Sequence, residues 1–136
     1  MGTLRQCVVT FLVAAACKSA SGPASVQIQT QSPRYQVGEA VTFTVANSGS
    51  QDVFLSYCCT IAVVLDRWQG SQWLNGNPGG CLAICSMVAI RVPAYGSHLD
   101  SAVVADTGRY RLHVGVASFR DGPPNWSPTS NTFEVR

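Results

Sequence analysis

The chain has 136 residues, of which 46% are hydrophobic and only 12% are charged, and its formal net charge is +2. This length suits one domain rather than two, and the many hydrophobic and few charged residues exclude a disordered chain. The basic residues are eight arginines and Lys18, and they are scattered, so no basic patch predicts nucleic-acid binding. With 12 Gly and 7 Pro between short alternating runs, the sequence is typical of an all-β protein.

The first 16 residues have the pattern of a signal peptide. A single positive charge, on Arg5, precedes an apolar run at residues 7–16. This run is too short to span a bilayer, which takes about 20 residues in a helix, but it matches the apolar segment of a signal peptide. A buried N-terminal helix is a poorer explanation, because the run is apolar on all sides and a tether-like sequence follows at 18–23. We therefore expect export.

The end of this run, Val-Ala-Ala-Ala-Cys at residues 13–17, carries a second signal. It resembles the lipobox of bacterial lipoproteins, in which cleavage occurs just before a cysteine that carries diacylglycerol. Ala15, Ala16 and Cys17 match that motif, whereas Ala14 departs from it, since a branched apolar residue is usual there. The resemblance implies that Cys17 is lipidated.

The chain thus divides into a signal peptide at 1–16, a lipidated cysteine with its tether at 17–24, and a domain at 25–136. A diacylated cysteine is sufficient for stable attachment to a membrane. Because Lys18 follows the cysteine, the resemblance implies an outer-membrane location if the cell is Gram-negative. The alternative is ordinary secretory cleavage, which leaves Cys17 unmodified and the protein secreted.

Short alternating segments from residue 25 onward predict β-strands. Residues 26–30 alternate between apolar and polar, and Val41, Phe43 and Val45 share one face of a second segment. Further strands are predicted at 53–57, 61–68, 72–74, 87–92, 99–104, 109–116 and 132–135. About eight short strands in one domain are typical of a single antiparallel β-sandwich.

Local chemistry also predicts how some of these strands pair and how one of them is buried. Asn and Gly at residues 47–50 favour a turn, so we expect 53–57 to pair back on the strand before it. The unbroken apolar run at 61–65 predicts a strand buried on both faces. The Gln-Gly-Ser segment at 69–71 predicts a hairpin turn.

The segment Asp-Thr-Gly-Arg-Tyr-Arg-Leu at 106–112 resembles the D-x-G-x-Y segment of immunoglobulin-like domains. In that family the tyrosine hydroxyl bonds back to the backbone a few residues upstream, a role that the resemblance assigns to Tyr110. Leu112 stands where antibody domains have a cysteine, so the antibody-type disulfide is absent. Residues 35–49 and 130–135 are similar to bacterial secreted Ig-like domains, some of which share the architecture of BsuPI-type proteinase inhibitors. The resemblance implies an Ig-like sandwich and, by fold analogy alone, proteinase inhibition as one option.

Four cysteines follow Cys17, namely Cys58, Cys59, Cys81 and Cys85. An even number in an exported domain predicts two disulfides. The vicinal cysteines point to opposite sides of an extended chain, so we expect each to bond to one of the other two, and either pairing remains open. Each bridge closes a loop of roughly 22 to 28 residues and contributes on the order of 3 kcal/mol.

A copper or zinc site built from the same four thiolates is the alternative. Thiolate and thioether ligands favour copper(I), and Cys81 and Cys85 form a C-x-x-x-C segment in a chain that also has Met87, His98 and His113. However, no His or Met follows at the spacing of known copper sites, and the vicinal pair is not a zinc knuckle. We therefore expect no metal and no other cofactor.

Function classes can be narrowed further from motifs. No nucleophile elbow, zinc-protease motif or phosphate-binding loop is present, so we expect no enzyme. The residues expected to contact a partner are Trp68, Trp73, Trp126 and Tyr95, because exposed Trp and Tyr are enriched at interfaces. The alternative for each tryptophan is that it covers an edge of the small core. The sequence predicts a lipid-anchored envelope protein whose domain binds an unknown protein or glycan, or has a structural role.

Overall fold

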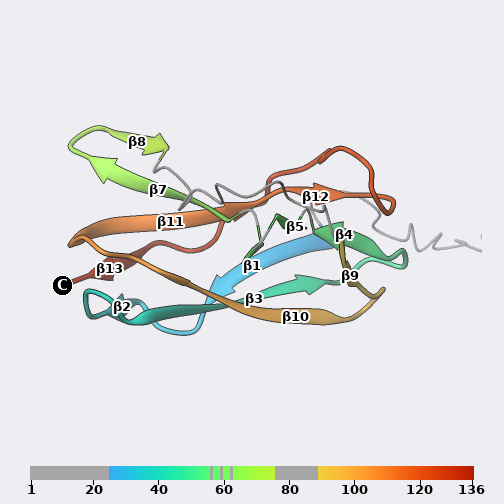
Figure 1. Ribbon diagram of the computed structural model, residues 1–136, viewed down its shortest axis with the longest axis horizontal. Coiled ribbons are helices and arrows are strands. Elements are labelled where there is room, and N and C mark those ends of the chain that lie inside the picture. The colour runs from blue at the N-terminus through green and yellow to red at the C-terminus, as the bar shows by residue number, and fades with distance from the viewer. Residues whose placement is uncertain (1–24, 56, 59, 62, 76–88) are drawn as a thin grey trace, which may run out of the picture.

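A computed structural model describes residues 25–55, 57–58, 60–61, 63–75 and 89–136. In this part of the chain every element is a β-strand, and the strands form two layers that pack face to face as a single β-sandwich (Figure 1). Within the same ranges no helix is long and apolar enough to cross a bilayer. The predicted all-β sandwich is confirmed.

Several predictions lie outside the described residues. These are the signal peptide at 1–16, the tether at 17–24 with the lipidation of Cys17, and the disulfides. Cys59, Cys81 and Cys85 fall in the undescribed segments, and only the backbone of Cys58 is described. Whether these cysteines form disulfides or hold a metal therefore stays a prediction.

One layer is a three-stranded antiparallel sheet. Its order is β1 (Val26–Thr30), β3 (Ala40–Asn47) and β10 (Ser97–Val103). β1 alternates between buried and exposed residues, as its sequence predicts. In β3 the predicted inward residues Val41, Phe43 and Val45 are all fully buried.

The second layer has five strands. Its order is β2 (Arg34–Tyr35), β13 (Phe133–Val135), β11 (Gly108–Val114), β7 (Val63–Gln69) and β8 (Gln72–Asn75). β2 and β13 pair in parallel, and the other neighbours pair antiparallel, so the antiparallel sandwich predicted from the sequence includes one parallel pair. The predicted hairpin is confirmed, with Gly70 at a φ of 65° in its turn.

A short sheet closes one end of the sandwich. β4 (Val53–Leu55) lies between β9 (Ile90–Val92) and β12 (Val116–Ala117) and pairs antiparallel with both. The expected pairing of 53–57 with the preceding strand is therefore wrong. Asn47, expected in the turn, is instead the last residue of β3. Its side chain bonds to Gln51 and holds the connection between β3 and β4 as a wider loop, so the two strands do not form a tight hairpin. Two very short strands, β5 (Tyr57–Cys58) and β6 (Thr60–Ile61), follow β4.

The apolar run at 61–65 is not buried on both faces, contrary to the prediction. Val63, Val64 and Leu65 are half-buried, and the side chains of residues 61 and 62 are not described. Leu65 lies opposite the buried Leu112 and faces the core, but Val64 lies opposite His113 on the outer face. The described neighbours of Val64 on this outer face are Asp66 of β7 and Arg111 and His113 of β11, so polar side chains and not a second apolar layer adjoin the run.

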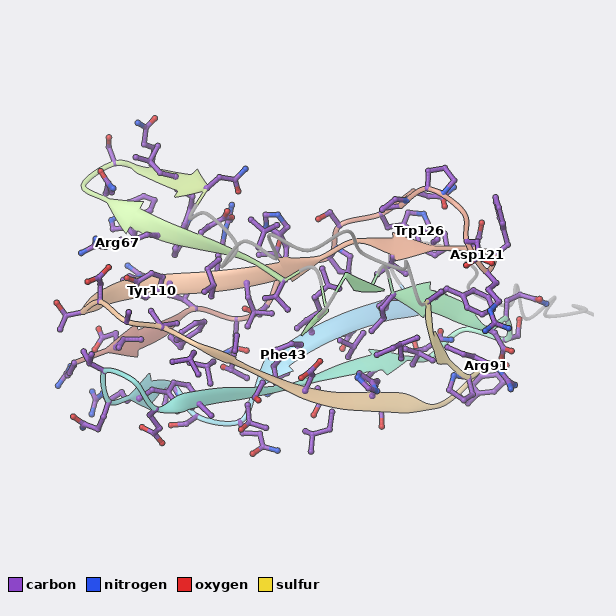
Figure 2. The ribbon with its side chains drawn as sticks, in the orientation of Figure 1. Phe43, Arg67, Arg91, Tyr110, Asp121 and Trp126 are labelled. Carbon is purple, nitrogen blue, oxygen red and sulfur yellow. The ribbon has the colours of Figure 1, made fainter. Side chains whose placement is uncertain are left out.

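The core lies between the layers, around Phe43 (Figure 2). Phe133 packs edge-on against Tyr35, with ring centroids 5.7 Å apart, and stacks on Tyr110 at 6.0 Å. Burying one such side chain stabilises the fold by about 1.5–3 kcal/mol. The Tyr110 hydroxyl donates to the Asp106 carbonyl oxygen at 3.1 Å, which confirms the corner that the D-x-G-x-Y segment predicts.

Candidate binding surface at one end of the sandwich

Three connections meet at the end of the sandwich closed by β4, β9 and β12. They are residues 48–52 between β3 and β4, residues 93–96 between β9 and β10, and residues 118–126 after β12, and together we call them the loop end. Figure 2 shows Arg91, Asp121 and Trp126 at this end and Arg67 and Tyr110 toward the other.

The first two connections are tied together by the buried side chain of Asn47. Its Nδ2 donates to the carbonyl oxygens of Gln51 at 2.8 Å and Pro93 at 3.1 Å, and its Oδ1 accepts from the Gly49 amide at 3.0 Å. The Tyr95 amide also donates to the Gly49 carbonyl oxygen, at 3.1 Å. Because Asn47 is only 2% exposed, these bonds are shielded from water and hold both loops in one geometry.

Asp52 makes a second tie between the same two connections. One carboxylate oxygen accepts from Arg91 Nε at 2.6 Å, and the other accepts from the Ala94 amide at 2.9 Å. The hydrogen bond from Ala94, followed by that from Arg91, holds the pKa of the Asp52 carboxyl below its ordinary value of 3.8. The carboxylate is therefore ionised at neutral pH, and its charge is balanced by the neighbouring guanidinium.

The third connection folds back onto β12. The Val116 and Trp126 backbones bond to each other in both directions, at 2.9 and 3.1 Å. Farther out, the Gly122 amide donates to the Phe119 carbonyl oxygen at 3.2 Å. The Phe119 ring lies over Gly122, where a Cβ atom would come within 2.6 Å of it, so a side chain at this position would push the exposed ring aside.

Two residues of the loop end have an unusual backbone conformation. Tyr95 and Asp121, at φ values of 56° and 62°, are the two non-glycine residues with positive φ in the described part of the chain. Such conformations cost of order 1–3 kcal/mol each and cluster at functional sites. Their presence in two different loops at the same end makes this end the first candidate for a site.

A cavity of about 310 Å³ opens between these loops. It is lined by Ser25, Gly49, Gln51, Asp52, Val53, Ser118 and Trp126. Its volume is at the lower end of the range for small-ligand sites. Two exposed aromatic residues adjoin lining residues of this cavity. Tyr95, whose amide bonds to Gly49, is 74% exposed, and Phe119, which follows Ser118 in the chain, is 56% exposed.

The structure separates the four predicted contact residues into two groups. Tyr95 and Trp126 lie at the loop end, whereas Trp68 and Trp73 lie opposite each other in the β7–β8 hairpin. Their rings meet edge to face at 5.1 Å, and the Arg111 guanidinium lies 4.6 Å from the Trp73 ring centre. Both hairpin tryptophans are half-buried by these contacts.

A buried carboxylate adjoins the hairpin tryptophans. Asp66, only 3% exposed, accepts from Arg111 Nε at 2.9 Å, and its carboxylate lies 3.4 Å from His113 Nδ1. Its Oδ1 has no hydrogen-bond partner among the described residues. The predicted outer-face position of His113 is confirmed, since it lies opposite Val64 and out of phase with Leu112.

Sequence reasoning missed most residues of these sites, among them Asp52, Asp66, Arg91 and Phe119. Phe119 had a usable signal, since an aromatic residue beside the Gly-Pro-Pro segment of a loop has little core to enter. No local sequence signal marks the two aspartates, because the arginine that pairs with Asp52 is 39 residues away and the one that pairs with Asp66 is 45 residues away. In the described part of the chain no group of three or more His, Cys, Asp or Glu residues could hold a metal ion.

Comparisons with known proteins add little to this description. No family model matches the chain, and no curated protein matches its sequence. The solved structures similar to it include Pseudomonas fluorescens alkylpurine DNA glycosylase AlkC bound to DNA containing an abasic site analog, at 15% identity and a TM-score of 0.40. That match covers 82% of this chain but only 30% of the glycosylase. Another is the ASH / PapD-like domain 7 of human CEP192, at 15% identity and a TM-score of 0.33, covering 96% of this chain and 94% of that one. At these scores neither structure informs the function.

Proposed function

We propose that this protein is a non-enzymatic binding module of the cell envelope, exported and held there by a lipid on Cys17. Its loop end recognises the partner, which is a protein or a glycan. The observation that supports this most is the exposure of Tyr95 and Phe119 on loops that border a cavity and are held in place by hydrogen bonds.

The energetics favour recognition at this end. A large exposed aromatic ring is unfavourable in water and gains free energy when a partner covers it. Ordering a flexible loop on binding costs conformational entropy and weakens the affinity. Asn47 and Asp52 already hold two of these loops, so this cost is smaller here. Arg91 and Ala94 each use one acceptor position on Asp52, so this carboxylate holds the first two loops together.

Binding of the fluorescently labelled protein, carrying Cys17→Ser so that no lipid attaches it to the membrane, to isolated envelopes of the cells that produce it tests the proposal. The double variant Tyr95→Ser/Phe119→Ser should bind at least about tenfold more weakly, since each ring contributes about 1 kcal/mol or more at an interface. Val37 and Val103 are also exposed apolar residues but lie outside the loop end, so Val37→Ser/Val103→Ser is the matched control and should bind normally. Equal binding by both variants would contradict the proposal.

A further inference from the structure

The described lining of the loop-end cavity presents no net charge to a ligand. Asp52 is the one charged residue among the described lining residues, and Arg91 Nε lies 2.6 Å from one of its carboxylate oxygens. A cationic ligand would have to displace Arg91, and an anionic ligand would meet the carboxylate. The cavity therefore favours a neutral ligand over a phosphate or an amine.

Its polar groups suit a ligand with several hydroxyl groups. A carboxylate has about four acceptor positions, and the contacts to Ala94 and Arg91 use one on each oxygen of Asp52. Hydroxyl groups of a ligand can donate to the positions that remain. Gln51 adds an amide that both donates and accepts, and Ser118 adds a hydroxyl.

Trp126 supplies an apolar wall to the same cavity. Its backbone is fixed by the paired bonds to Val116, and its side chain packs partly against the core, so the indole is held in place. The face of an aromatic ring carries partial negative charge. The C–H bonds on the flat face of a sugar ring carry partial positive charge and suit such a wall.

From this combination we infer that the cavity binds a neutral saccharide unit and that the partner of the loop end is a glycan. A pyranose ring has hydroxyl groups around its edge and a face of C–H groups. Asp52 and Gln51 can bond the hydroxyl groups, and the Trp126 indole can pack against the C–H face, since all three residues line the cavity. A volume of about 310 Å³ accommodates a sugar unit at the end or along the edge of a longer chain. This inference rests on the proposed function of the loop end.

Chemical treatment of the envelopes separates the two candidate partner classes. Periodate cleaves the vicinal diols of sugars, and a protease removes exposed proteins. We expect periodate to abolish binding of the labelled protein and protease to leave it unchanged, and we expect neutral oligosaccharides of glucose, mannose or N-acetylglucosamine to compete better than heparin or polygalacturonate.

Variants connect this binding to the cavity. Gln51→Ala should weaken binding by about 3- to 10-fold, which corresponds to one lost hydrogen bond. Gln29→Ala, an exposed glutamine on β1, is the matched control and should have no effect. Trp126→Leu, with its thermal unfolding checked, should weaken binding by at least about tenfold.

The possible failures are distinct. Loop-end-dependent binding that resists periodate and is lost on protease treatment would overturn the glycan inference and leave the proposed function standing. Better competition by heparin or polygalacturonate would overturn the argument for a neutral ligand. Binding that is insensitive to the Tyr95/Phe119 double variant would remove the proposed function and this inference together.

Discussion

Tyr110 links the turn before β11 to the core with a single side chain. Its ring stacks on Phe133, and its hydroxyl reaches the Asp106 carbonyl oxygen. Burial of the phenol is the main reason that its pKa is raised above the ordinary value of 10.0, so the hydroxyl stays protonated and continues to donate at neutral pH. This residue was predictable because its partner is only four positions away.

Removing that hydroxyl tests the corner. Tyr110→Phe should lower the free energy of unfolding by about 1 kcal/mol, because one intramolecular hydrogen bond is lost while the ring remains. Urea denaturation measures the change. Tyr95→Phe removes the same atom from a side chain that is 74% exposed and should change stability by less than about 0.5 kcal/mol. Equal effects of the two variants would show that the Tyr110 hydroxyl has no special role.

Asp66 is the most deeply buried charged side chain described. Asp66→Ala should lower the free energy of unfolding by about 2 kcal/mol or more, because Arg111 and His113 then lose their carboxylate. Asp100 pairs with His98 at 3.8 Å, and both side chains are partly exposed. Asp100→Ala should therefore lower stability by under about 1 kcal/mol. Urea midpoints of the two variants give the comparison, and an Asp66 variant as stable as the Asp100 variant would be evidence against a structural ion cluster.

Among the elements, the β7–β8 hairpin depends most clearly on one backbone conformation. Gly70, in its turn, has a φ of 65° with open space around its Cα. Gly70→Ala should therefore cost about 1–2 kcal/mol from backbone strain alone. Gly70→Asn should cost less, since asparagine tolerates this conformation. Thermal unfolding of both variants tests this ranking. If the turn did not require positive φ, the alanine variant would be at least as stable as the asparagine variant.

The tie between the first two loops is expected to depend on pH. Asp52 has a folded-state pKa below the ordinary 3.8, so its contribution to stability is complete above that value and is lost as the pH falls through the lower folded-state pKa. Unfolding by urea between about pH 5 and pH 2 should show this acid-side loss. Asp52→Asn should reduce the change of unfolding free energy with pH in this range. If the variant has the same pH profile as the unchanged protein, the acid-side loss does not come from Asp52.

Elements with regular alternation could be predicted from the sequence, but apart from the β7–β8 hairpin their partners could not. β1, β3 and β11 alternate strictly, so their inward residues, such as Phe43 and Leu112, follow from period-two geometry. The sequence of β4 is equally consistent with pairing to β3 or to β9 and β12. The choice depends on the buried Asn47, whose contact with Pro93 is 46 residues away and leaves no local pattern.

Considered as a whole, the molecule keeps its two groups of aromatic residues apart. The hairpin tryptophans contact each other and Arg111, whereas at the loop end Tyr95 and Phe119 are exposed and Trp126 lines the cavity. The sequence predicted that aromatic residues would mark the binding surface but could not tell these groups apart. Their separation depends on which layer and which end of the sandwich each loop reaches (Figure 1).

Hydrogen–deuterium exchange of the exported protein, with and without the envelopes that it binds, tests the central claim most directly. Amides at 48–52, 93–96 and 118–126 should exchange more slowly in the bound protein, and those of the β7–β8 hairpin turn should not change. Protection confined to the hairpin or to β10, with the three loops unaffected, would contradict the claim that the loop end is the binding surface.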